Sequence, residues 1–247
     1  MTEPVRIAMW SGPRNLSTAL LRAWGNRPDT TVTDEPLYAH YLHTTGIGHP
    51  ARDEILAAYD HDWRRVTAWL TGPVPGGHAI WYQKHMTHHI TEDIDLGWLA
   101  GLRHCFLIRS PAEVIASYRR VRHDPTLDDL GLPQQWTLFA HVAHTADSGA
   151  VPPVIDAADL LRDPRAVLSA VCDRLGVAFS ERMLSWPPGR RATDGVWADH
   201  WYGVVERSTG FTPYEPRQVT LAARFDGLLA AAKDIHDRLA AHRLVTV

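Results

Sequence analysis

The first chemical feature of the sequence is a turn rich in groups that bind anions. It reads Ser11-Gly12-Pro13-Arg14-Asn15-Leu16-Ser17-Thr18 and joins a short apolar run to a segment with helical periodicity. Glycine permits a tight turn, and the unpaired N–H groups and dipole of a helix N-terminus attract an anion. Arg14 adds a bidentate cation, and Ser17 and Thr18 add hydroxyl donors. We therefore predict that this turn, with Gly12, Pro13 and Asn15, holds a phosphate or phosphosulfate group; the alternative is a turn with Ser/Thr capping alone.

The turn differs from the loop that binds nucleoside triphosphates in P-loop kinases. That loop ends in Gly-Lys-Ser/Thr, and its lysine reaches the β- and γ-phosphates. Here Leu16-Ser17-Thr18 stands in the corresponding place, so this lysine is missing. A kinase that uses ATP is therefore the less favoured alternative.

A second anion-binding pattern follows a later apolar run that ends at Ile108. Arg109 leaves the predicted strand, Pro111 occupies the favoured first position of a helix, and Ser117 lies two turns further on. Arg109 and the Ser117 hydroxyl can converge on a second phosphate. The alternative is a surface arginine and an ordinary helix serine.

A third segment adds two arginines on a glycine-containing loop. It reads Arg190-Arg191-Ala192-Thr193-Asp194-Gly195-Val196-Trp197. We expect Arg190 and Arg191 to close over the same phosphate, with Trp197 beside them. Taken alone, the segment is only a basic loop.

Together these three segments resemble the sulfotransferases that use 3′-phosphoadenosine 5′-phosphosulfate (PAPS). The turn from Arg14 to Thr18 is similar to the family's 5′-phosphosulfate loop, and Arg109 with Ser117 matches its 3′-phosphate motif. The segment from Arg190 to Trp197 is similar to the late Arg-Lys-Gly-x-x-Gly-x-Trp loop, which also reaches the 3′-phosphate. The resemblance covers about residues 5–200, and the chain looks most like the bacterial and plant sulfotransferase-like branch.

Three departures from the family pattern accompany this resemblance. Arg14 stands where many members have lysine, Ala192 replaces the first glycine of the late loop, and Ala198 replaces a lysine that often follows the tryptophan. The resemblance implies transfer of a sulfuryl group from PAPS to a hydroxyl or amine of a small-molecule acceptor, with adenosine 3′,5′-bisphosphate as product and no metal. A non-catalytic regulatory protein that binds this nucleotide is a further alternative.

Such a transfer needs a group that removes a proton from the acceptor, and two strand ends offer one. Glu35 follows the second predicted strand, and the resemblance supports it as the base; the alternative is a salt-bridge carboxylate before Pro36. After the third strand, Lys84 can bind the transferring group and His85 can act as base or donor. We include Arg14, Glu35, Lys84 and His85 among the catalytic candidates.

Three histidines near the third strand also raise the possibility of a metal site. His85 and His89 are four residues apart, but no third ligand with characteristic spacing accompanies them and His88. We therefore expect no metal.

Bulk composition limits the classes of partner. The chain has 247 residues, 45% of them hydrophobic, and a formal net charge of -3, which leaves no basic footprint for nucleic acid or an acidic membrane. No basic-then-apolar signal peptide opens the chain, and no apolar stretch approaches the ~20 residues that span a bilayer. We expect a cytoplasmic protein whose cysteines, Cys105 and Cys172, are buried thiols, although a single disulfide is an alternative.

Alternating strands and helices must position these groups. We predict strands at residues 5–10, 30–33, 79–83, 104–108 and 153–156, and helices at residues 16–24, 54–70, 111–122, 165–175 and 216–242. Such alternation implies a mostly parallel sheet with helices on both faces. We therefore predict one α/β domain over residues 1–247, a three-layer sandwich, and the resemblance to the sulfotransferases implies that its fold is P-loop-like.

Overall fold

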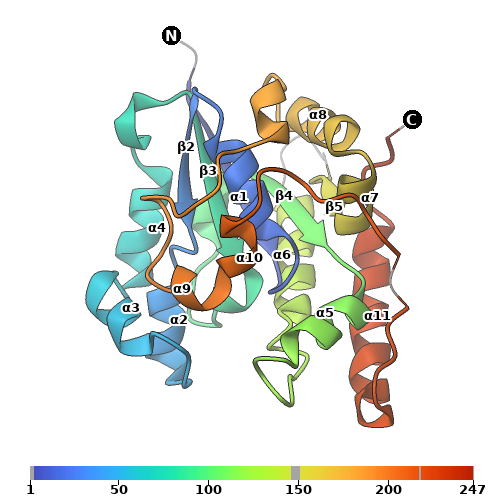
Figure 1. The fold of residues 1–247 in the computed structure, drawn as a ribbon. Helices are drawn as coiled ribbons and strands as arrows, with labels where there is room; N and C mark the ends of the chain where they lie inside the picture. Colours follow the sequence, from blue (N-terminus) through green and yellow to red (C-terminus); the bar gives the residue numbers. More distant parts are fainter. Residues whose placement is uncertain (1–2, 146–150, 217, 247) are drawn as a thin grey trace.

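A five-stranded sheet forms the centre of the computed structural model, which describes residues 3–145, 151–216 and 218–246. The strands lie in the order β2-β3-β1-β4-β5, and every pairing between them is parallel. Their bounds are β1 Val5–Ser11, β2 Thr30–Asp34, β3 Ile80–Met86, β4 Arg103–Ile108 and β5 Val154–Asp156. The five predicted strands and the parallel α/β fold class are therefore confirmed (Figure 1).

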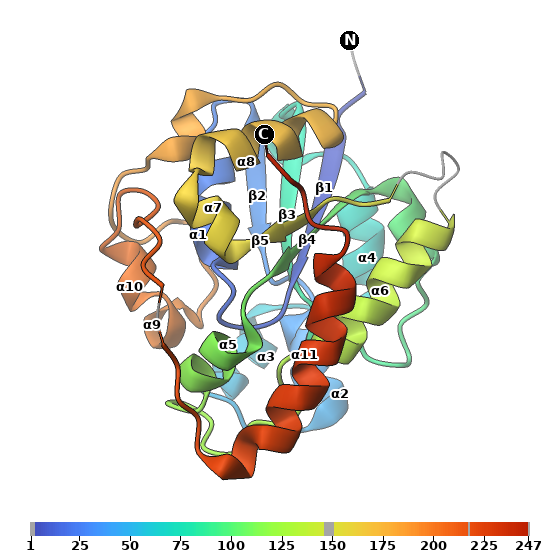
Figure 2. The same cartoon turned by 90° about the vertical axis from the view of Figure 1, so that its right-hand side faces the viewer.

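Alternating side chains of the central strands supply two separate cores. In β1, Ile7 and Met9 pack into one core, and Ala8 and Trp10 pack into the other. The first core is covered by α1 (Ser17–Gly25), α7 (Ala157–Arg162) and α8 (Pro164–Arg174). The second is covered by α6 (Leu132–Thr145) and α11 (Asp226–Ala240), which lie on the other face of the sheet (Figure 2). The sheet is thus the middle of three layers, as predicted.

The predicted helix over residues 54–70 is wrong, because the segment forms two helices. These are α3 (Arg52–Ala58) and α4 (Trp63–Thr71), and Tyr59 between them is extended. The Asp62 carboxylate accepts a hydrogen bond from the backbone N–H of Arg64 and caps α4. Asp60 accepts a bond from the Asp62 N–H, so local side-chain bonds replace the helical ones.

Two other predicted helices are longer than those observed. The helix predicted over residues 111–122 ends earlier, as α5 (Pro111–Tyr118). The helix predicted over residues 216–242 begins only at α11, after a 3₁₀ turn at Ala223–Phe225, and residue 217 lies outside the described residues. The helices predicted over residues 16–24 and 165–175 are confirmed as α1 and α8. Five of the described helices were not predicted: α2 (Tyr38–Thr45), α6, α7, α9 (Ala198–Trp201) and α10 (Gly203–Glu206).

The two cysteines occupy the first core as free thiols. Cys105 on β4 and Cys172 on α8 are both buried and unbridged, which confirms the expectation of buried thiols. Within the described ranges, every helix is too short or too polar to cross a membrane.

Candidate active site

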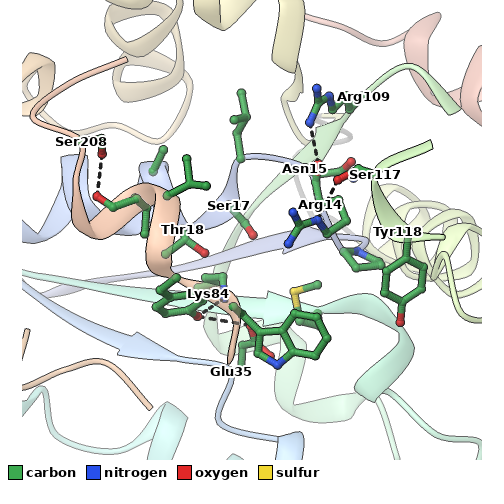
Figure 3. Close-up of a pocket in the computed structure, with 18 of the residues that line it drawn as sticks. Arg14, Asn15, Ser17, Thr18, Glu35, Lys84, Arg109, Ser117, Tyr118 and Ser208 are labelled. Atoms are coloured by element: carbon green, nitrogen blue, oxygen red, sulfur yellow. Dashed lines mark hydrogen bonds and ion pairs between the residues drawn. The ribbon is translucent and has the colours of Figure 1, made fainter. Parts of the chain in front are cut away.

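A cavity of about 330 Å³ lies where the carboxyl ends of the strands meet, which is the usual place for a ligand in an open parallel sheet. Both anion motifs and the candidate base contribute to its wall (Figure 3). The residues predicted from the sequence that line it are Pro13, Arg14, Asn15, Ser17, Thr18, Glu35, Lys84, Arg109 and Ser117. The fold thus brings together groups that are up to about a hundred positions apart in the chain.

The first turn has the backbone of an anion-binding nest. Arg14 and Leu16 both adopt φ of 64°, in the left-handed region, and such alternation turns successive N–H groups toward one concavity. No side chain in the described ranges caps the N-terminus of α1, so its first N–H groups are left for a ligand. Gly12 does not line the cavity, but it is required there because a Cβ would lie 2.2 Å from the carbonyl oxygen of Leu130.

Arg14 joins the two anion motifs directly. Its Nε donates to the Ser117 hydroxyl at 2.9 Å, and Arg109 donates to the Arg14 carbonyl at 3.0 Å. Arg109 also pairs with Glu113 at 2.7 Å, which holds its guanidinium in place. Burial, followed by the nearby charges of Arg109 and Arg120, lowers the pKa of Arg14. Within the described residues the two terminal nitrogens of Arg14 have no protein partner, so they are left for an anion.

Lys84 is the centre of a buried cluster at the ends of β2 and β3. Its ammonium group donates to Asp34 at 2.8 Å, to the Tyr202 hydroxyl at 2.8 Å and to Glu35. Tyr202 in turn donates to the second oxygen of Asp34 at 2.6 Å. The lysine has three N–H donors, and all three have acceptors inside the protein.

This cluster determines the charge states of its members. Burial raises the pKa of Glu35, the neighbouring Asp34 raises it further, and Lys84 opposes the shift. Burial works against the charge of Lys84 as well, but Asp34 and Glu35 outweigh it and raise the pKa of Lys84 to about 12. The lysine therefore stays charged beside a carboxylate that holds its proton more tightly than an exposed one.

His85 does not join this cluster. Neighbouring residues of a strand point to opposite faces, so His85 faces the second core, where it stacks on Trp10 with ring centroids 4.4 Å apart. Burial lowers the pKa of His85 to about 3. The ring is thus neutral and does not line the cavity.

The late segment lies outside the cavity. Arg190 pairs with Asp199, and Arg191 donates to the carbonyl of Pro187 at 2.8 Å. Asp194 forms a buried ion pair with Arg22 of α1, and the buried ring of Trp197 donates to the Tyr202 hydroxyl at 3.2 Å. The structure therefore places this segment as a support for α1 and for the Lys84 cluster.

Several cavity residues were not singled out from the sequence. Tyr38, His49, Tyr118, Ser208 and Phe211 all line it. They come from helices and loops whose positions depend on tertiary packing. Two of them had a local signal, since Tyr38 lies three residues after Glu35 and Tyr118 directly follows Ser117. In the part of the chain that the structure describes, no group of three or more His, Cys, Asp or Glu side chains is arranged to hold a metal ion.

Comparison with known proteins agrees with this geometry. The profile of the sulfotransferase domain family matches residues 5–242. Two proteins of Arabidopsis thaliana are similar in sequence. Branched-chain-amino-acid aminotransferase-like protein 1 is 34% identical over 98% of this chain and 43% of its own length. Branched-chain-amino-acid aminotransferase-like protein 2 is 32% identical over 96% of this chain and 41% of its own length. The chain thus spans about two fifths of the length of these relatives.

Solved structures with a similar fold include two sulfotransferases. The sulfotransferase domain of the curacin biosynthetic pathway has a TM-score of 0.58 at 15% identity, with 97% of this chain and 99% of that chain covered. The sulfotransferase of Alicyclobacillus acidocaldarius has a TM-score of 0.52 at 15% identity, with 99% and 98% covered. Because the family profile covers nearly the whole chain and the fold agrees, this protein belongs to the sulfotransferase domain family.

Proposed function

We propose that this protein transfers a sulfuryl group from PAPS to a hydroxyl or amine of a small-molecule acceptor. One observation supports the proposal above the others. Two anion-binding motifs from different strand ends touch through Arg14, Arg109 and Ser117, on the wall of the cavity that also contains a buried carboxylate. A ligand with two separate anionic groups matches this arrangement.

The residues present fit the donor in number and charge. Arg14, Ser17, Thr18 and the N-terminus of α1 would hold the 5′-phosphosulfate, and Arg109 with Ser117 would hold the 3′-phosphate. Among the described residues, Glu113 is the one anion paired with the adjacent guanidinium groups of Arg14 and Arg109. An anionic ligand between them would relieve this repulsion.

The chain's own groups would then serve the transfer. PAPS, when bound, supplies the activated sulfuryl group. Glu35 accepts the proton of the acceptor hydroxyl or amine, since its raised pKa makes it a stronger base than an exposed carboxylate. Lys84 contributes positive charge and holds Glu35 in position, because its N–H groups are committed to Asp34, Glu35 and Tyr202.

Calorimetry with the purified protein tests the donor site. Adenosine 3′,5′-bisphosphate should bind, and adenosine 5′-monophosphate should bind more weakly because it lacks the 3′-phosphate. Arg109→Ala should weaken bisphosphate binding by roughly ten- to a hundredfold, the effect of one charge-assisted hydrogen bond. The matched control is Arg65→Ala, because Arg65 pairs with Asp60 on the exposed face of α4.

ATP with Mg²⁺ provides the opposing titration. Tight binding of ATP-Mg²⁺ without any response to the bisphosphate would overturn the proposal in favour of a kinase. Bisphosphate binding without sulfuryl transfer to any acceptor would support a regulatory protein instead.

A further inference from the structure

Several rings also line the cavity, and the proposed donor site makes no use of them. Tyr38 follows Glu35 closely, and its ring stacks on His89 with centroids 4.5 Å apart. His49, His88 and Trp201 continue this lining. The charged residues that line the cavity are Arg14, Arg109, Glu35 and Lys84. The rings add no further charge to this lining.

The two histidines in this lining are neutral rings. Burial lowers the pKa of His88 to about 3 and lowers the pKa of His89 well below its ordinary value. Their exposed fractions are 9% and 2%. At neutral pH each ring therefore carries one N–H donor and one bare nitrogen.

Packing indicates which nitrogen carries the hydrogen. The Nδ1 atoms of His88 and His89 are buried and have no hydrogen-bond partner among the described residues. A Cβ built on Gly131 would lie 3.4 Å from Nδ1 of His88, so this atom faces backbone. An orphaned N–H is rarer in buried sites than an orphaned acceptor, which places the hydrogen on Nε2.

The Nε2 atoms are the side of these rings that a ligand can reach. Neither Nε2 has a protein partner in the described part of the chain, and neither is closed off from open space as the Nδ1 atoms are. Since both residues line the cavity, His88 and His89 offer two unused N–H donors there. A buried donor without an acceptor costs free energy until a ligand supplies one.

We infer that the acceptor is an uncharged, hydroxylated molecule with a second oxygen that accepts a hydrogen bond from Nε2 of His88 or His89. The inference rests on the proposed function and narrows its acceptor class from hydroxyl or amine to hydroxyl. A protonated amine has no lone pair and would meet two N–H donors, neither of which it can satisfy. With the nucleotide bound, its anionic groups neutralise Arg14 and Arg109, so a carboxylate would be desolvated beside Glu35, whose charge repels it.

Four probes that share one phenol ring test this assignment. Para-hydroxyphenylacetamide is neutral with a second oxygen, para-ethylphenol is neutral without one, tyramine carries a cation, and para-hydroxyphenylacetate carries an anion. Binding of each to the protein saturated with adenosine 3′,5′-bisphosphate is measured, together with kcat/KM for transfer from PAPS. The amide should exceed para-ethylphenol by about tenfold, the effect of one hydrogen bond, and both charged probes should fall below it.

Variants show whether the histidines cause this preference. His88→Phe and His89→Phe keep a ring but remove the donor, so at least one should abolish the advantage of the amide. His88→Gln and His89→Gln keep an N–H donor and should retain it. His43→Phe is the control, because His43 lies on α2 outside the cavity and stacks on His61.

Nucleotide binding separates this inference from the proposed function. Loss of bisphosphate binding by the unmodified protein would overturn both. If the bisphosphate binds, but the protein prefers tyramine or para-hydroxyphenylacetate or does not discriminate among the four probes, only the acceptor class is overturned. An amide preference that survives both phenylalanine variants would overturn the role of the histidines.

Discussion

Lys84 and Glu35 form a buried ion pair at the ends of two neighbouring parallel strands. Asp34 is paired in register with Lys84, so β2 and β3 deliver the carboxylates and the ammonium to the same point. The side chain of Lys84 is 1% exposed and that of Glu35 is 10% exposed. Two carboxylates therefore share one lysine, and the excess negative charge lies beside the cavity that contains Arg14.

Glu35→Gln should lower sulfuryl transfer by about 10²–10⁴-fold, the range for loss of a general base. Glutamine keeps the size of the side chain but does not accept the proton. Affinity for adenosine 3′,5′-bisphosphate, measured by calorimetry, should be unchanged because Arg14 and Arg109 remain. Glu181→Gln is the control, since Glu181 is exposed and pairs with Arg165; equal turnover in the two variants would exclude Glu35 as the base.

The pH dependence of transfer should reveal the raised pKa of Glu35. A base works only when deprotonated, so kcat/KM should fall as the pH decreases through this pKa, which lies above the ordinary value of 4.5. Lys84, with a pKa of about 12, stays charged throughout this range. The measurement is a pH–rate profile with an acceptor that does not titrate below neutral pH. A residual rate in Glu35→Gln that keeps the same acidic limb would contradict the assignment.

Asp194→Ala should reduce the free energy of unfolding by about 3–5 kcal/mol, because it leaves the charge of Arg22 buried without a partner. The side chains of this pair are 2% and 0% exposed. Arg190→Ala breaks an exposed pair with Asp199 and should change stability by less than about 1 kcal/mol. Urea unfolding of both variants measures the difference. Similar small effects would show that the late segment does not hold α1 in place.

Gly12→Ala should destabilise the protein by roughly 1–3 kcal/mol, the usual cost of overpacking. The added methyl group would lie 2.2 Å from the Leu130 carbonyl oxygen, so the turn or its neighbour has to move. Thermal unfolding and bisphosphate titration should both show a loss. Gly48→Ala is the matched control, because no atom of the described residues lies within 4 Å of a Cβ at that position.

Local sequence alone was enough to predict the strands and to single out two candidate anion-binding motifs. The apolar runs predict all five strands because buried parallel strands need continuous apolar residues. The turn at Arg14 and the Arg109–Ser117 pair are recognisable because each is a short segment whose chemistry depends on spacing along the chain. Helix ends were less predictable: side-chain bonds from Asp60 and Asp62 interrupt the segment predicted as one helix.

Tertiary structure decided which candidate groups share a cavity. Lys84 and His85 are neighbours in sequence, but the pleat of β3 sends them to opposite faces. The two arginines of the late segment point elsewhere because a buried ion pair between Asp194 and Arg22 fixes that segment against α1. The rings of His88 and His89 lie beside Tyr38 in the cavity wall because α2 packs against the end of β3. Residues far apart in the chain meet in this cavity because parallel strands end at one edge of the sheet. The periodicity of a single segment carries no information about its distant neighbours, so the sequence pattern alone does not predict these contacts.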